Sequence, residues 1–171
     1  SGAGPASGQW QGRQLAITGY TLQIDALSLD AHLELKALIG QPVLLELQTD
    51  QSKSVLRPLH GYVTQAQGIG ANGGMARYRL AVQPWLAFLG HGRDSAVFQD
   101  QTVLQIVQSI FTDYQNTLQG SGKLQPAWRL DIADASVYPK RSLTTQYQES
   151  DLQFVERLLL EEGLFYWFEH S

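Results

Sequence analysis

Residues 147–170 read YQESDLQFVERLLLEEGLFYWFEH, a capped helix followed by a glycine and an apolar tail. Ser150 and Gln153 have the spacing of a capping box, in which each side chain satisfies a free backbone N–H group of the other residue. Gly163 supplies the left-handed residue that commonly ends a helix. This stretch therefore predicts a helix over residues 151–162 and an extended segment after it.

The extended segment, Leu164 to Phe168, is apolar at every position, and we predict that it is a β-strand. A strand without a polar face needs to be covered on both sides. The sequence stops shortly afterwards, at Ser171. We therefore expect the chain to be a fragment of a longer polypeptide, with the rest of that polypeptide or its neighbours covering this strand.

The composition is that of a globular protein, since 43% of the 171 residues are hydrophobic and 16% are charged. A net charge of −4 offers no basic surface, so we expect neither nucleic acid nor an anionic membrane as a partner. The absence of cysteine excludes disulfides and thiolate metal sites. No apolar run reaches the ~18 residues of a membrane helix, and residues 1–8 lack the features of a signal peptide.

The first half of the chain predicts antiparallel strands. Four segments have a strand-like pattern, at residues 20–26, 43–49, 59–67 and 75–83. Apolar and polar residues alternate in the first two, as one buried face requires. The last two flank Gly70 to Gly74, where Gly and Asn tolerate the positive φ of a tight turn, and they predict a hairpin. Between the first two strands, Leu35 to Ile39 fits a short helix.

The second half predicts a further helix and two more strands. The helix begins at Thr102 and runs to about Tyr114, because Thr102 and Gln105 repeat the capping-box spacing and an apolar stripe follows. Residues 128–132 and 142–147 have the pattern of strands. We therefore predict a mainly β fold with two α-helices, of the α+β class.

Two patterns that could indicate a bound cofactor have simpler interpretations. Residues 68–73 match G-x-G-x-x-G, but that motif binds a nucleotide only where it opens a helix. A strand is predicted to follow at Met75, so we interpret the motif as the hairpin turn. The histidines lack the spacing of metal ligands, and we expect no metal site from His32, His60, His91 and His170.

Two other functions compete with a structural role. Glu161 or Glu162 with Asp113 could form the acid pair of a glycoside hydrolase, which needs carboxyl groups about 5 or 6.5–9.5 Å apart. Solvated acids are also common at helix ends, so we do not predict an enzyme. Aromatic residues could stack sugars in a carbohydrate-binding module, although core packing accounts for the same residues: Tyr62, Tyr78, Trp85 and Phe88.

The segment from Gln146 to His170 fits the pattern QYxESDxxFVxRLLxEEGxFYxFEH. In this pattern the sequence resembles the VgrG spike proteins of bacterial type VI secretion systems, in their region related to the phage baseplate hub. Shorter stretches agree in the same order, and the resemblance covers about residues 13–170. The residues that carry the signature are Tyr147, Glu149, Ser150, Asp151, Phe154, Arg157, Glu161, Glu162, Gly163, Tyr166 and Phe168.

The resemblance implies an antiparallel β-barrel-like hub domain, with a barrel-like part over residues 13–95 and a helix-containing part over 96–171. Residues 1–12 are expected to be a flexible tail of the kind left by cloning. In this family the hub forms homotrimers that cap a hexameric, Hcp-like tube protein and deliver effector proteins through a target membrane. The implied protein is not an enzyme and needs no cofactor. It assembles in the bacterial cytoplasm and is expelled by the secretion machine without a signal peptide.

Overall fold

The structure, a computed structural model, describes residues 19–49, 52–118 and 124–170. They form two compact units, of which the first runs to Trp85 and includes the chain end from Trp167 onward. The second comprises Leu86–Tyr166. The division thus falls earlier than residue 95, where the resemblance placed it, and the predicted tail over residues 1–12 lies outside the described residues.

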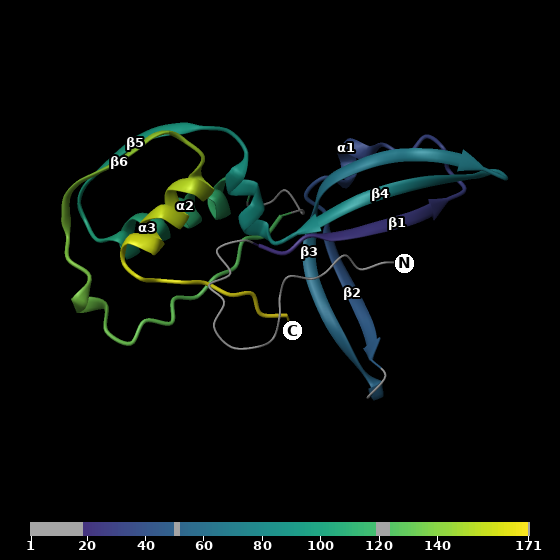
Figure 1. Ribbon diagram of the computed structural model, residues 1–171. Helices are drawn as coiled ribbons and strands as arrows, with labels where there is room; N and C mark the ends of the chain where they lie inside the picture. Colours follow the sequence, from purple (N-terminus) through teal and green to yellow (C-terminus); the bar gives the residue numbers. More distant parts are fainter. Residues whose placement is uncertain (1–18, 50–51, 119–123, 171) are drawn as a thin grey trace. The chain divides into compact units, whose positions relative to one another are not determined.

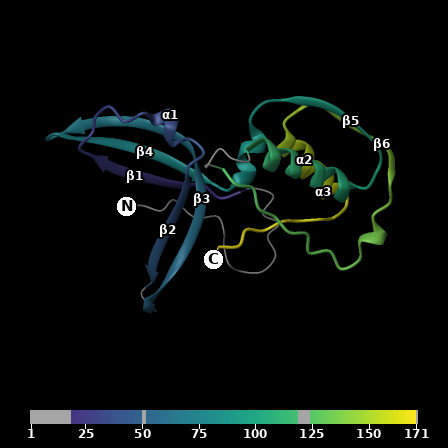
Figure 2. The same cartoon turned by 180° about the vertical axis from the view of Figure 1, so that it is seen from behind.

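The first unit is a curled antiparallel sheet, a half-barrel with the strand order β1-β4-β3-β2. Its elements are β1 (Leu22–Ser28), α1 (Leu35–Leu38), β2 (Pro42–Thr49), β3 (Ser52–Asn72) and β4 (Met75–Gln83). Figures 1 and 2 show that the long β3 belongs to two arms of the sheet, because it pairs with β2 in its first half and with β4 in its second. The four predicted strands and the short helix are confirmed.

The strand β3 bends where it changes partner. Its ladder with β2 ends at Tyr62, and its ladder with β4 shifts register between Val63 and Gln65. Such an irregularity bends a strand and increases its twist. A Cβ atom at Gly61 would lie 2.6 Å from Cγ1 of Val82, so the close approach of β4 at the bend requires a glycine.

The hairpin of β3 and β4 contains the glycine-rich motif. The two strands are joined by Gly73 and Gly74, whose φ angles are +60° and +81°. No helix follows the motif, because β4 begins directly at Met75. The interpretation as a hairpin turn is therefore confirmed, and a nucleotide-binding loop is excluded.

The second unit packs two helices against a two-stranded ribbon. Its elements are a 3-10 helix that begins in the first unit (Trp85–Gly90), β5 (Asp94–Gln101), α2 (Val103–Leu118), a short 3-10 helix (Ala135–Val137), β6 (Arg141–Glu149) and α3 (Asp151–Glu161). Figures 1 and 2 show the curved β5–β6 ribbon beside the adjacent helices α2 and α3. The core contains the buried side chains of Leu89, Val103, Ile106, Val107, Phe154, Val155 and Leu158.

Both predicted capping boxes are present. The Thr102 N–H group donates to Oε1 of Gln105 at 2.9 Å, and the Gln105 N–H group donates to Oγ1 of Thr102 at 3.2 Å. Ser150 and Gln153 make the same reciprocal pair at 3.1 and 3.2 Å. Local sequence therefore decides where both long helices begin.

Two strand predictions are wrong. Residues 128–132 form no strand, and the ring of Trp128 instead packs edge-on against Phe111 of α2, with 5.4 Å between the centroids. The segment from Leu164 to Phe168 is extended but pairs with no strand among the described residues. Its side chains alternate in exposure, with Phe165 64% exposed and Trp167 51% exposed. One face of this segment is therefore half-buried, while the other is open in this structure.

Gly163 ends α3 with a φ angle of +68°, as predicted. A Cβ atom there would meet nothing within 4 Å, so a substitution acts through the backbone conformation alone. We expect Gly163→Val to lower the free energy of unfolding by about 1–2 kcal/mol, because a β-branched residue resists the left-handed region. Urea unfolding measures this loss, and Gly163→Asn should lose less. An unchanged midpoint for the valine variant would contradict the role of Gly163 in ending the helix.

Candidate functional site

The signature segment forms an ion-pair network centred on Arg157 of α3. Its Nη2 donates to Oε1 of Glu149 at 2.5 Å and to the carbonyl of Thr145 at 3.1 Å. Its Nη1 donates to Oε1 of Glu161 at 3.2 Å. The guanidinium also lies over the ring of Phe154, 5.2 Å from its centroid. Arg157 thereby attaches α3 to the end of β6.

A second arginine, Arg141, attaches the start of β6 to the end of α3. Its Nη1 donates to Oε2 of Glu161 at 2.6 Å, and its Nη2 donates to Oε1 of Glu162 at 2.5 Å. The hydrogen bond from Arg141, and then that from Arg157, lowers the pKa of Glu161 below its usual value. Together the two arginines fasten both ends of β6 to one helix.

The hydrolase hypothesis fits this geometry poorly. Glu161 and Glu162 each bind a guanidinium, whereas a general acid needs a raised pKa. Asp113 is exposed on α2 and takes part in none of these bonds. The glutamates of the signature, Glu149, Glu161 and Glu162, therefore act as anchors for arginine in this structure.

Asp151 joins three elements at the start of α3. Its carboxylate accepts a hydrogen bond from Nε2 of Gln146 at 2.7 Å and another from the Tyr114 hydroxyl at 2.9 Å. Gln146 is only 2% exposed and also donates to the carbonyl of Glu149 at 3.2 Å. Burial and the bond to Asp151 raise the pKa of Tyr114 above its usual value, so the hydroxyl keeps its proton and donates. The cluster connects α2, β6 and α3.

The remaining signature residues have separate positions. Phe154 is fully buried and stacks on Phe98 of β5, with 5.6 Å between the ring centroids. The Tyr166 hydroxyl donates to Oε1 of Glu156 at 2.9 Å, and burial raises the pKa of that glutamate. Phe168 packs edge-on against Tyr20 within the first unit. The structure therefore gathers most of the signature around α3 of the second unit, whereas Phe168 belongs to the first unit.

Sequence reasoning missed several partners of the signature, among them Arg141, Gln146, Tyr114 and Glu156. Gln146 could not have been found from the alternation, because the apolar positions 143 and 147 of the predicted strand would be expected to face the core and positions 144 and 146 to face water. The structure buries both Thr144 and Gln146. A polar residue on a buried face needs a hydrogen-bond partner, and only the structure shows that Gln146 has one in Asp151.

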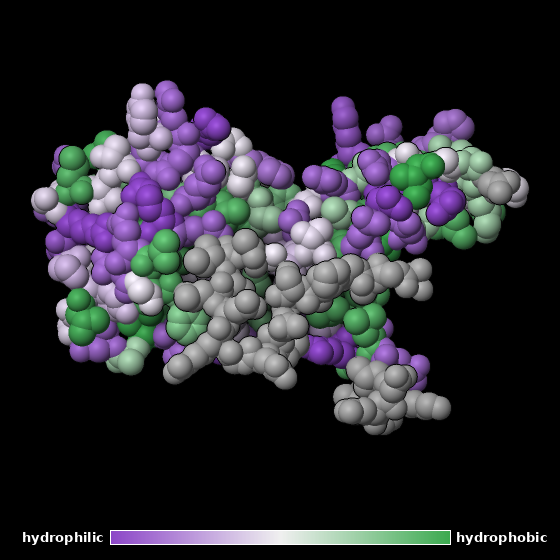
Figure 3. Space-filling view, in the orientation of Figure 1, coloured by the Kyte–Doolittle hydropathy of each residue, from purple (hydrophilic) through white to green (hydrophobic). Residues whose placement is uncertain are grey.

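Tyr147 is an exposed aromatic residue of the signature. It is 71% exposed and lies opposite Ser95 of β5 on the outer face of the ribbon. Figure 3 shows hydrophobic side chains scattered among polar ones on the face drawn there.

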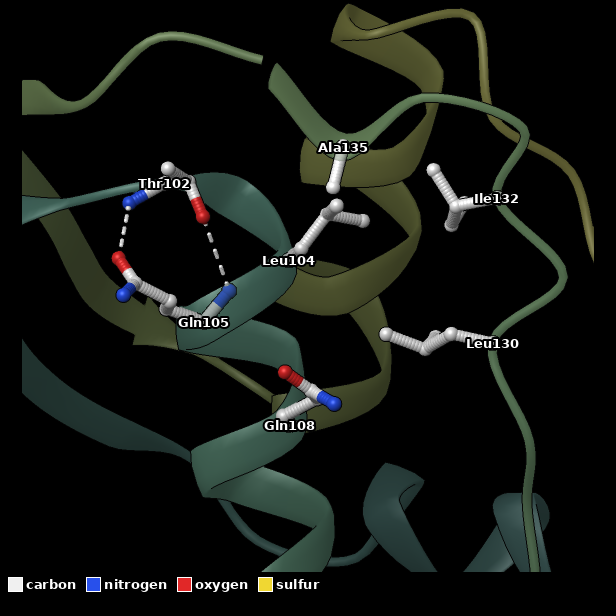
Figure 4. A pocket seen from close by; sticks show the side chains of 7 residues that line it. All are labelled: Thr102, Leu104, Gln105, Gln108, Leu130, Ile132 and Ala135. Carbon is white, nitrogen blue, oxygen red and sulfur yellow. Dashed lines mark hydrogen bonds between the residues drawn. The ribbon is translucent and has the colours of Figure 1, made fainter. Parts of the chain in front are cut away.

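The second unit contains a cavity of about 380 Å³ between α2 and the segment that follows it. Figure 4 shows the side chains of Leu104, Leu130 and Ile132 turned toward one another, while Thr102 and Gln105 bond to each other as the helix cap. Gln108 and Ala135 complete the lining. None of the seven lining residues is acidic, basic or histidine, so the cavity offers no group for acid–base catalysis.

The structure separates the remaining candidate residues. Only His60 and His170 come together, where the His60 N–H group donates to Nδ1 of His170 at 3.0 Å. Among residues 19–49, 52–118 and 124–170, no group of three His, Asp or Glu could hold a metal ion. In the same described ranges, no helix is long and apolar enough to cross a membrane.

The aromatic residues considered for sugar stacking form no exposed row. Tyr78 is 6% exposed, and its hydroxyl donates to the carbonyl of Asp30 at 2.8 Å. Tyr62, Trp85 and Phe88 are half-buried. Packing within the two units therefore accounts for these aromatic side chains.

The chain combines a half-barrel sheet with a helical unit that its signature residues hold together. This architecture is that of a mainly β structural protein of the hub type. The chain belongs to the phage tail baseplate hub family, because the profile described as "Phage tail baseplate hub (GPD)" matches residues 13–171. This membership confirms the predicted fold class and the family resemblance.

Curated relatives lie among bacterial spike proteins. The chain is 35% identical over 163 residues to type VI secretion system spike protein VgrG4b of Pseudomonas aeruginosa, covering 95% of this chain and 18% of the relative. It is 31% identical to VgrG5 of the same organism, covering 95% of this chain and 19% of that protein. An actin cross-linking toxin, VgrG1 of Vibrio cholerae, is 28% identical, with 13% of the toxin covered. The chain thus spans about a fifth or less of these relatives.

A solved structure agrees with the sequence relatives. The E. coli c3393 protein has a TM-score of 0.61 and 28% sequence identity, covering 84% of this chain and 36% of that chain. It is described as a component of the type VI secretion system with structural similarity to the T4 bacteriophage tail proteins gp27 and gp5. Sequence and fold therefore place the chain with the same class of structural proteins.

Proposed function

We propose that this chain is part of a trimeric spike hub that caps the secretion tube of a contractile injection machine. The observation that carries the proposal is the match to the baseplate hub family over residues 13–171. Similarity to bacterial spike proteins supports the same role. The hub binds a hexameric, Hcp-like tube protein and helps to deliver effectors through a target membrane. Its role is mechanical rather than catalytic, and it leaves the cytoplasm through the machine itself.

The oligomeric state tests this proposal. The full natural polypeptide that contains this chain should have the mass of a homotrimer in multi-angle light scattering. The trimer should also bind the hexameric tube protein in sedimentation experiments. A single-subunit mass at all accessible concentrations would contradict the proposed hub.

The outer face of the β5–β6 ribbon is the surface that we assign to contacts between subunits. Val97, Leu143 and Tyr147 are 60%, 57% and 71% exposed, and the strand register places them on one face. The opposite face of β6 buries the polar residues Thr144 and Gln146. In a ribbon with one face in water, polar residues lie on the exposed face and apolar residues on the buried face. In the β5–β6 ribbon the two kinds of residue are exchanged. A second copy of the subunit is the proposed cover, because a hub is built from identical chains and tyrosine is enriched at interfaces.

Tyr147→Glu should weaken trimer formation of the full polypeptide by about 2 kcal/mol, the loss typical of a central interface residue. Sedimentation equilibrium measures this change. In the present chain the same substitution should alter stability by less than about 0.5 kcal/mol, because the side chain is exposed. Tyr147→Phe is the matched control and should remain trimeric. If the Tyr147→Glu protein formed trimers with unchanged affinity, the outer face of the ribbon would not be part of the subunit interface.

A further inference from the structure

The backbone of His60 in β3 is bound by two side chains from distant parts of the first unit. Its N–H group donates to Nδ1 of His170 at 3.0 Å, and its carbonyl accepts a hydrogen bond from the Tyr20 hydroxyl. The ring of Tyr20 lies 5.2 Å from the ring of His170 and 5.4 Å from that of Phe168, measured between centroids. These contacts hold residues 167–170, which we call the strap, against β3.

The strap lies where the β3–β4 ladder has already ended. That ladder runs only to the pair Tyr62–Gln83, and on its other side His60 is opposite Leu44 of β2. In an antiparallel ladder, pairs that bond to each other alternate with pairs whose N–H and C=O groups point away. Because both groups of His60 bind side chains, the pair with Leu44 is of the second kind. The N–H and C=O groups of His60 thus point away from β2, toward the side of β3 on which the ladder with β4 has already ended.

A sheet edge of this kind is a template for another strand. His170 and Tyr20 occupy the donor and the acceptor that such a strand would use at His60. The two contacts differ in their dependence on protons. A tyrosine hydroxyl donates whenever it is protonated, whereas Nδ1 of histidine accepts only in the neutral ring with its proton on Nε2.

We propose that the strap is a proton-sensitive latch, in which neutral His170 closes the edge of β3 at His60 and protonation of His170 opens it. In the charged ring both nitrogen atoms carry hydrogen. The Nδ1–H group then faces the N–H group of His60, and repulsion replaces the hydrogen bond.

The groups around the latch favour its closed form near neutral pH. Burial, followed by the charges of His60 and Arg57 on β3, lowers the pKa of His170 below its usual 6.5. Burial and the neighbouring Tyr62 raise the pKa of Tyr20 to about 12, so its hydroxyl continues to donate. A lowered pKa in the closed form means that the latch contributes fully above about pH 6.5, and that its contribution is lost as the pH falls.

Amide hydrogen exchange of the chain, followed by NMR, tests the latch. The exchange of the His60 amide, divided by its intrinsic rate at each pH, should become about fivefold faster on acidification, as expected for loss of one hydrogen bond. The midpoint of this step should coincide with the titration of the His170 ring. A His170 titration without any step at the His60 amide would overturn the proposal, and this measurement needs no variant.

Two variants separate His170 from its neighbour. His170→Gln retains a side-chain carbonyl that can accept the bond but does not titrate, so the step should disappear. His60→Gln removes the nearby titratable ring and keeps the backbone N–H group, so the step should remain. Two results would overturn the latch: a step that persists in His170→Gln, or a step that is lost in His60→Gln but not in His170→Gln. Either result would assign the titrating proton to a group other than His170.

Discussion

Phe154→Ala should destabilise the second unit by about 3–5 kcal/mol, the range observed when a fully buried phenylalanine is truncated. Phe154 has no exposed surface, stacks on Phe98 of β5 and lies beneath the guanidinium of Arg157. The substitution therefore removes core volume and two ring contacts where α3 meets the ribbon. Urea unfolding, followed by circular dichroism, measures the loss.

The same chain supplies a matched control for this substitution. Phe165 follows α3 and is 64% exposed, so Phe165→Ala should change the stability of the chain by less than about 0.5 kcal/mol. Equal effects at the two positions would contradict the core that we describe. A loss below about 1 kcal/mol for Phe154→Ala would do the same, since truncation of a fully buried phenylalanine costs well above that.

The parts of the fold that the sequence predicted are those with local causes. Thr102 and Ser150 each bond to a residue three positions later, so the starts of both long helices could be read directly from the sequence. Gly163 likewise acts through its own φ angle. The hairpin of β3 and β4 was predictable because its glycine turn separates two strand-like arms of the chain.

The parts that the sequence did not predict depend on distant partners. The segment Asp94–Gln101 has few apolar residues and no strand period, and it is a strand because β6 pairs with it. Residues 128–132 do alternate, but Trp128 packs against Phe111 of α2, and the backbone of this segment pairs with no strand in the described structure. Alternation indicates which side chains share a face and does not report what the backbone bonds to.

The same limit applies to the signature residues. Ser150 could be given its role as a cap from the sequence, whereas Glu161 and Glu162 could not be given theirs. Their partner, Arg141, lies 20 and 21 positions earlier in the chain. Only the folded ribbon brings the start of β6 to the end of α3, so these glutamates could be mistaken for a catalytic pair.

Arg141→Met should lower the free energy of unfolding by about 2–3 kcal/mol at neutral pH, since it removes hydrogen bonds to two carboxylates. Methionine retains much of the arginine stem, and the change therefore tests the charge more than the packing. The side chain of Glu162 is 17% exposed and would lose the guanidinium that it binds. Arg79→Met is the matched control. Its pair with Asp25 is 38% and 39% exposed and is screened by solvent, so we expect a clearly smaller loss than for Arg141→Met.

The loss caused by Arg141→Met should also depend on pH. Arg141 is the largest cause of the lowered pKa of Glu161, whose ordinary value is 4.5. A carboxylate with a lowered pKa in the folded state stabilises the protein above its unfolded pKa, and this contribution is lost as the pH falls through the folded value. The stability difference between the two proteins should therefore be largest above about pH 4.5 and narrow below it. Urea unfolding at a series of pH values measures the difference. A gap that stays constant through the acidic range would mean that Arg141 acts through packing rather than through its bond to Glu161.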